Sequence, residues 1–172
     1  IWDISSSDNL ELTYGYDQYD KARYVDDRRT HDHDYSNRQH TLHGLYSHFW
    51  GIGTLTVGAD YMNDYLTTYQ FIDNTHHSQY SVDAFAQFDY NPLTWFNVIA
   101  SIREDYFSGA DTGALTGRLA MMFKPRPLTI RASYAGGFRA PTLKEMYMNF
   151  DMAGIQMIYG NPDLKPERSH NF

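Results

Sequence analysis

Apolar and polar residues alternate along most of this chain with the two-residue period of a β-strand. After Thr54, for example, Leu55 and Val57 fall on one side of the backbone, and Asp60 and Met62 fall on the other. The same pattern predicts about seven strands, which cover residues 10–24, 38–50, 54–69, 80–90, 96–107, 115–123 and 128–134.

Turn-forming residues separate these strands in two sets that alternate along the chain. One set is short and lies at residues 5–8, 51–53, 91–94 and 124–127. The other set is mostly longer and more polar, and lies at residues 26–37, 72–79, 108–113 and from Gly136 onward. Alternate turns of an up-and-down antiparallel sheet lie at the same end. We therefore predict an all-β antiparallel meander with short turns at one end and long loops at the other.

The lengths of the predicted strands and the positions of the aromatic residues indicate that the strands cross a membrane. Most of the predicted strands reach or exceed the roughly 9 to 11 residues that a tilted strand needs to cross a bilayer. Aromatic rings gather near both ends, as two girdles of an outer-membrane barrel would: Phe49, Trp50, Tyr90, Trp95 and Phe96 beside the short turns, and Tyr65, Tyr69, Phe71, Tyr106 and Phe107 toward the long loops. The charged residues of the strands mostly lie on the opposite row, facing a wet lumen: Asp60, Asp83, Asp89, Arg103, Arg118 and Arg131.

Alternation alone is also typical of a soluble secreted β-sandwich, which could bind glycans through exposed Tyr and Trp. An open sheet is unfavourable in lipid, because the amides and carbonyls of its edge strands have no hydrogen-bond partners there. The opening "IWDI" resembles the tail of a strand and the closing "ERSHNF" the start of another. We therefore expect residues 1–172 to be a segment of a larger barrel.

Composition and motifs exclude several other classes. The formal net charge of −7 leaves no basic stripe for a nucleic acid backbone. The chain has no cysteine, so it has no disulfide, thiolate metal site or cysteine nucleophile. No nucleophile elbow, phosphate-binding loop or zinc helix motif occurs. We expect no enzymatic activity and no cofactor.

The last fifth of the chain carries the most specific signal. It contains a first box at Phe138, Arg139, Ala140 and Pro141 and a second box at Asn161, Pro162, Asp163, Leu164, Lys165, Pro166 and Glu167. In this order, the two boxes resemble the paired signature of TonB-dependent outer-membrane receptors, where both lie in one extracellular loop. Between them, Thr142 and Glu145 have the spacing of a helix capping box.

This resemblance implies a bacterial outer-membrane barrel of about 22 strands, closed by a plug and energised through TonB. Residues 1–172 would be an incomplete part of that barrel, without the plug or the TonB box. The implied partners are the TonB complex, acting through the missing N-terminal part, a large metal-chelate nutrient, outer-membrane lipid and possible contact with a surface lipoprotein.

The resemblance also implies a metal-containing nutrient as ligand, with a ferric siderophore first and cobalamin or haem behind it. Haem receptors of the family usually place a histidine between the boxes, and this chain has none there. The candidate ligand-binding residues are Arg139, Tyr147, Met148, Asp151, Met157 and Tyr159. The alternative is that the boxes shape the loop and touch no ligand.

Histidines concentrate elsewhere in the chain. His31 and His33 would lie on the same side of an extended segment and are secondary candidates for a divalent metal. A solvated loop is the alternative for that segment. His43 and His48 fall on opposite faces of their predicted strand and form no pair.

Overall fold

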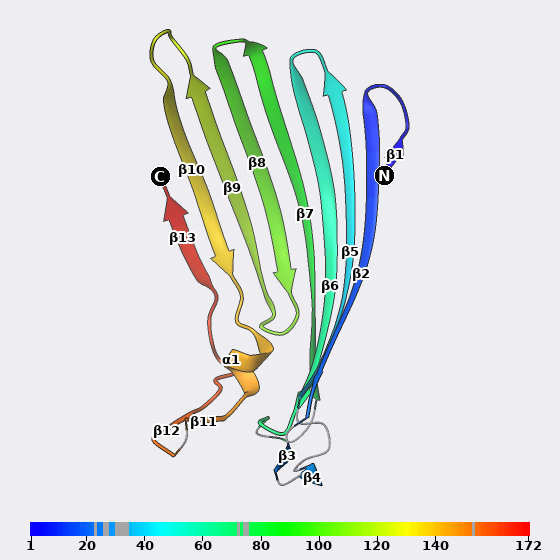
Figure 1. Ribbon diagram of the computed structural model, residues 1–172. Helices are drawn as coiled ribbons and strands as arrows, with labels where there is room; N and C mark the ends of the chain where they lie inside the picture. Colours follow the sequence, from blue (N-terminus) through cyan, green and yellow to red (C-terminus); the bar gives the residue numbers. More distant parts are fainter. Residues whose placement is uncertain (23, 26–27, 30–34, 72, 74–75, 153) are drawn as a thin grey trace.

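The computed structural model describes all residues except 23, 26–27, 30–34, 72, 74–75 and 153. A single nine-stranded antiparallel sheet dominates it, with the strand order β1-β2-β5-β6-β7-β8-β9-β10-β13 (Figure 1). The strands are β1 (Trp2–Asp3), β2 (Asp8–Lys21), β5 (Tyr35–Trp50), β6 (Gly53–Thr68), β7 (His76–Leu93), β8 (Phe96–Phe107), β9 (Thr112–Phe123), β10 (Ile130–Arg139) and β13 (Glu167–Asn171).

The predicted meander is confirmed. Seven long strands lie between short partial strands at the two edges, β1 and β13, and the termini lie at opposite sides of the open sheet (Figure 1). The short turns occupy residues 4–7, 51–52, 94–95 and 124–129 at one end, hereafter the short-turn end. The other end, hereafter the loop end, holds β3 (Tyr24–Val25), β4 (Arg28–Arg29), α1 (Leu143–Tyr147), β11 (Phe150–Met152) and β12 (Gln156–Ile158).

All four predicted loops at the loop end were too long. Residues 35–37 belong to β5, and residues 136–139, which include Phe138 and Arg139 of the first box, belong to β10. Residues 76–79 belong to β7, which spans 18 residues, rather than to a loop. Residues 108–111 form a tight turn between β8 and β9. At the start of β7 and where β8 meets β9, the hydrophobic contrast between the two faces fades, although the backbone ladder continues. Periodicity therefore marked the amphipathic part of each strand and missed its polar extension.

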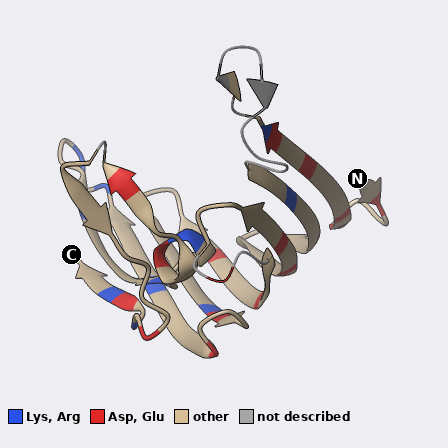
Figure 2. Cartoon of the chain, turned by 90° about the horizontal axis from the view of Figure 1, so that it is seen from below, with Lys and Arg blue, Asp and Glu red and all other residues tan. Residues whose placement is uncertain are grey.

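The sheet is curved into an open arc (Figure 2). The side chains on its two faces differ in polarity. Residues paired across neighbouring strands share a face, so Leu42, Tyr61 and Val82 form one row on the convex side, and all three are exposed. On the concave side the buried side chains include the polar Ser47, Ser81, Gln79 and Asp83.

The sheet thus exposes apolar side chains and buries polar ones, which is the reverse of the arrangement in a water-soluble domain. The two other sheets have two strands each and lie at the loop end. Within the described residues no second sheet covers the apolar face, so the β-sandwich alternative is not favoured. No helix in the described part of the chain is long and apolar enough to cross a membrane.

A small hydrophobic core lies at the loop end, between the sheet and α1. It consists of Leu66, Phe71, Leu143 and Met146, each at most 2% exposed. The prediction that Phe71 belongs to a lipid-facing girdle was therefore wrong. The chain after β6 turns inward, and the Phe71 ring packs under α1 instead of facing outward.

Candidate functional site

The segment between β10 and β13, residues 140–166, begins with a capped helical turn. The Thr142 hydroxyl accepts a hydrogen bond from the Glu145 backbone N–H at 3.3 Å, and the Glu145 carboxylate accepts one from the Thr142 backbone N–H at 2.9 Å. This is the predicted capping box, and it satisfies two amides that the helix itself leaves unpaired. The cap fixes α1 so that Leu143 and Met146 point into the sheet.

Several contacts hold this segment against the inner wall. The Asn149 backbone N–H donates to the Gln70 carbonyl at 2.9 Å, and Phe71 forms a β-bridge with Met148. The His77 ring of β7 stacks on the Tyr147 ring, with centroids 3.8 Å apart. The segment is thus folded inward at the loop end, on the concave side of the sheet (Figure 2).

Arg139 joins the two sequence boxes. Its guanidinium forms ion pairs with Glu145, at the start of α1, and with Glu167, at 3.2 Å in the second box. Hydrogen bonds from the Thr142 backbone N–H and from Arg139 hold the pKa of Glu145 below its ordinary value. Arg139, predicted as a ligand residue, therefore has a clear architectural role.

The second box is fastened to α1 by backbone contacts. The Asn161 N–H donates to the Glu145 carbonyl at 3.0 Å, and the Asn161 side chain accepts from the Asp163 N–H at 3.0 Å. A Cβ at Gly160 would lie 2.7 Å from the Met146 carbonyl oxygen, a distance at which only glycine fits. Both boxes therefore shape one folded unit.

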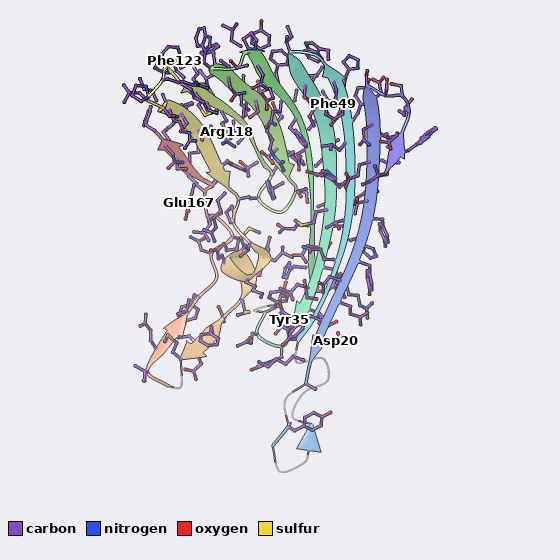
Figure 3. The ribbon with its side chains drawn as sticks, turned by 45° about the horizontal axis from the view of Figure 1, so that its top comes forward. Asp20, Tyr35, Phe49, Arg118, Phe123 and Glu167 are labelled. Atoms are coloured by element: carbon purple, nitrogen blue, oxygen red, sulfur yellow. The ribbon has the colours of Figure 1, made fainter. Side chains whose placement is uncertain are left out.

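A pocket of about 520 Å³ opens beside this unit at the loop end. Aromatic rings and a cation line it: Lys21, Ala22, Tyr24, Tyr35, Tyr69, Gln70 and Phe150. The Lys144 ammonium of α1 lies 5.0 Å from the centroid of the Tyr35 ring, and brings a second cation to its edge. Tyr35 is at the start of β5, next to Asp20 and Lys21 at the end of β2 (Figure 3).

The predicted ligand residues divide into two groups. Tyr147 and Met148 lie on the wall, half-buried beside the core. Asp151 and Met157 face each other in the β11–β12 hairpin, and Tyr159 follows it with 69% of its surface exposed. His31 and His33 lie outside the described residues.

Sequence reasoning missed Lys21, Tyr35 and Lys144. Lys21 ends β2 and Tyr35 begins β5, whereas the predicted strand boundaries lay three residues away, at 24 and 38, and Lys144 lies within α1.

The concave wall carries a separate polar network, as predicted for a wet lumen. Arg103 forms ion pairs with Asp83 at 2.7 Å, with Asp105 at 2.9 Å and with Asp60 at 3.7 Å, and His43 contacts Asp60. His48 instead contacts Asp8 at 2.8 Å on the other face, so the two histidines are not a pair. No cluster of three or more metal-ligating side chains occurs among the residues that the structure describes.

Comparison with known proteins agrees with this architecture. The profile of the TonB dependent receptor-like β-barrel family matches residues 1–172. An iron-regulated outer membrane virulence protein of Vibrio cholerae is 48% identical over 44 residues, which are 25% of this chain and 7% of that protein.

Two solved structures have the same fold. The siderophore receptor PirA of Acinetobacter baumannii superposes with a TM-score of 0.71 at 19% identity, over 96% of this chain and 29% of PirA. A G324V mutant of the ferric enterobactin receptor PfeA of Pseudomonas aeruginosa gives 0.70 at 16% identity, over 98% of this chain and 29% of PfeA. The chain thus spans less than a third of the solved receptors that it matches.

The fold and the family are those of transport receptors rather than enzymes, and they place the chain in the bacterial outer membrane. The convex apolar row, the lumenal charges, the two joined boxes and the family match over the full 172 residues agree with one another. The chain belongs to the TonB dependent receptor-like β-barrel family.

Proposed function

We propose that this chain is part of the wall and the extracellular mouth of a receptor for TonB-energised uptake of a ferric siderophore. The observation that carries the proposal is the inward-folded segment 140–166, which places rings and cations around a pocket at the loop end. A ferric siderophore is a large chelate with flat or apolar parts, and many are anionic. Tyrosine rings offer it apolar contact with a polar edge, and lysines offer it charge.

In this proposal the loop-end pocket and the β11–β12 hairpin contact the ligand in different ways. Lys21, Tyr35 and Lys144 form a fixed part, because Lys144 belongs to a helix packed on the wall. The exposed Met157 and Tyr159 form an outer part, where a flexible thioether and a ring adapt to the shape of the ligand. Arg139 holds the two boxes together and acts on the ligand through that scaffold.

The names of the relatives support the same ligand class. PirA is described as a siderophore receptor, PfeA as a ferric enterobactin receptor, and the Vibrio protein as iron-regulated. Cobalamin and haem are the alternatives. A haem ligand supplied by residues 142–160 would be a tyrosine or methionine, since these residues contain no histidine.

Energy coupling requires more than this chain. We propose that the plug and the TonB box belong to the part of the receptor outside residues 1–172, and that the TonB complex acts through them. The polar concave wall suits that arrangement, because carboxylates such as Asp60 and Asp105 can face water or another polar segment.

The test is uptake by the full receptor that contains this chain, expressed in a bacterial strain with no other siderophore, haem or cobalamin receptor. Cells receive radiolabelled ferric siderophores, haem or cobalamin, with and without a functional TonB. We expect TonB-dependent accumulation of a ferric siderophore. Accumulation of cobalamin or haem in its place would contradict the ligand assignment, and TonB-independent accumulation would contradict the coupling.

A further inference from the structure

The turn between β9 and β10 concentrates positive charge at the short-turn end. Residues 124–129 include Lys124 and Arg126, and Pro125 and Pro127 flank the arginine. The three other short turns, at residues 4–7, 51–52 and 94–95, contain no lysine or arginine. This turn is therefore a local cationic site in a chain whose formal net charge is −7.

A pocket of about 740 Å³ opens between this turn and the turn at residues 94–95. Its lining combines the two cations with the apolar side chains of Trp95, Phe123 and Leu128. The Trp95 and Phe123 rings meet edge to face at 5.3 Å, and Leu128 is 63% exposed. The Lys124 backbone N–H donates to the Trp95 carbonyl at 2.8 Å and so fixes the two turns to each other.

This pocket lies on the lipid-facing side of the sheet. Phe123 is paired with Phe96 and Ile130 in the same convex row as the exposed Leu119 and Met121. Met122, its neighbour on the concave row, lines a second pocket of about 360 Å³, which shares Trp95 and Lys124 with the first but not Phe123, Arg126 or Leu128. Figure 3 shows Phe123 at the end of β9, next to the turn. The pocket is thus continuous with the apolar face, at the level where the strands leave the bilayer.

The two boxes, which the family resemblance places in an extracellular loop, lie at the loop end, so the short-turn end faces the periplasm in this proposal. We propose that this pocket binds the headgroup phosphate of an anionic phospholipid from the periplasmic leaflet of the outer membrane. Lys124 and Arg126 contact the phosphate, because both side chains form strong charge-assisted hydrogen bonds to phosphate oxygens. Trp95 and Phe123 lie at headgroup depth, where aromatic rings are favoured, and Leu128 contacts the upper acyl chain. The site depends on the sheet lying in a membrane, and not on which nutrient is transported.

A lipid fits this pocket better than a soluble anion. A free anion would satisfy the two cations and leave the exposed Trp95 and Leu128 in water. A phospholipid covers both parts, since its phosphate and its acyl chains are joined. Charge and apolar lining therefore favour the same occupant.

The test uses the full receptor in detergent, stripped of lipid and titrated with dioleoyl phosphatidylglycerol while native mass spectrometry counts the bound lipids. The variant is Lys124→Gln with Arg126→Gln. We expect the affinity for the first bound lipid to fall about tenfold or more, because each basic residue near an anionic lipid surface contributes appreciably. The matched control is Arg118→Gln with Arg131→Gln, which removes the same charge from the concave face of the same hairpin.

Each outcome decides the proposal. Loss of affinity in the first variant and not in the control supports it. The proposal is overturned if the first variant keeps the wild-type lipid affinity, or if the control loses as much affinity as the first variant. Displacement of the lipid by millimolar inorganic phosphate would assign the site to the free ion and also overturn it. Lys124 and Arg126 are exposed, so both variants should unfold at the wild-type temperature, which a thermal scan checks.

Discussion

The imidazole of His77 lies parallel to the phenol ring of Tyr147, with 3.8 Å between the ring centroids and 6° between the planes. The Phe71 ring packs edge-on against the same imidazole, with 4.7 Å between the centroids, and the Asp73 carboxylate pairs with the imidazole at 3.1 Å. His77 belongs to the sheet and Tyr147 to α1. The stack therefore fastens the segment between the two sequence boxes to the barrel wall.

Removing the stack should loosen that segment. We expect Tyr147→Ala to speed amide hydrogen exchange at residues 146–149 of the full receptor, because such a ring pair contributes about 0.5–1.5 kcal/mol beyond its buried area. Tyr147→Phe keeps the ring and should exchange like wild type. Tyr159→Ala, in which an exposed ring is lost, serves as the control. Equal exchange in Tyr147→Ala and Tyr159→Ala would show that the stack does not hold the segment.

The Met146 side chain should contribute more to the same attachment. It is fully buried against Leu66, Phe71 and Leu143, and truncation of a buried methionine to alanine costs about 2–5 kcal/mol. We expect Met146→Ala to make residues 143–149 sensitive to limited proteolysis. Met157→Ala changes the same residue type at a 45% exposed site and should not. Resistance of Met146→Ala equal to that of Met157→Ala would contradict the core described above.

The capping contact of Glu145 should depend on pH. Its pKa is lowered in the folded segment, first by the Thr142 backbone N–H and then by Arg139, so the carboxylate form stabilises the fold. That stabilisation is complete above the pKa of Glu145 in the unfolded chain, and it is lost as the pH falls through the lower pKa of the folded segment. The protection factor at α1, which corrects the exchange rate for the intrinsic rate at each pH, should therefore fall on acidification in wild type. Glu145→Gln should remove the pH dependence of that local step, and an identical acid response in both proteins would rule out Glu145 as its origin.

Uptake should distinguish the two groups of predicted ligand residues. We expect the double change of Tyr147 and Tyr159 to Ala to weaken ferric siderophore uptake more than the double change of His31 and His33 to Ala. Tyr159→Ala alone separates ligand contact from packing, because Tyr159 is exposed and Tyr147 is stacked. Wild-type uptake by the tyrosine double variant would remove both tyrosines from the site.

Local patterns in the sequence predicted the sheet and the cap, because local interactions produce them. The two-residue period of β6 and β7 reflects one face against lipid and one against the lumen, and the capping box needs only Thr142 and Glu145. The ends of the strands were harder to predict from the sequence. At His76 in β7, beyond the apolar band, both faces carry polar groups and the period carries no contrast.

Long-range packing could not be read in the same way. Phe71 looks like a girdle residue by its position in the sequence, and only α1, about 70 residues later, buries it. The loop-end pocket likewise combines Lys21, Tyr35 and Phe150 from separate parts of the chain. Such groupings depend on how the segment 140–166 folds inward, which no local pattern specifies.

The most direct test of the account is the environment of the convex face. Spin labels at Leu55, Val57 and Leu119 of the full receptor in lipid bilayers report collisions with oxygen, which enriches in hydrocarbon, and with a water-soluble nickel chelate. Labels at Thr56 and Ser101 on the concave rows are the controls. We predict that oxygen dominates at the three convex sites. Domination by the nickel chelate at those sites would show that the apolar rows do not face lipid, and would contradict the barrel-wall account.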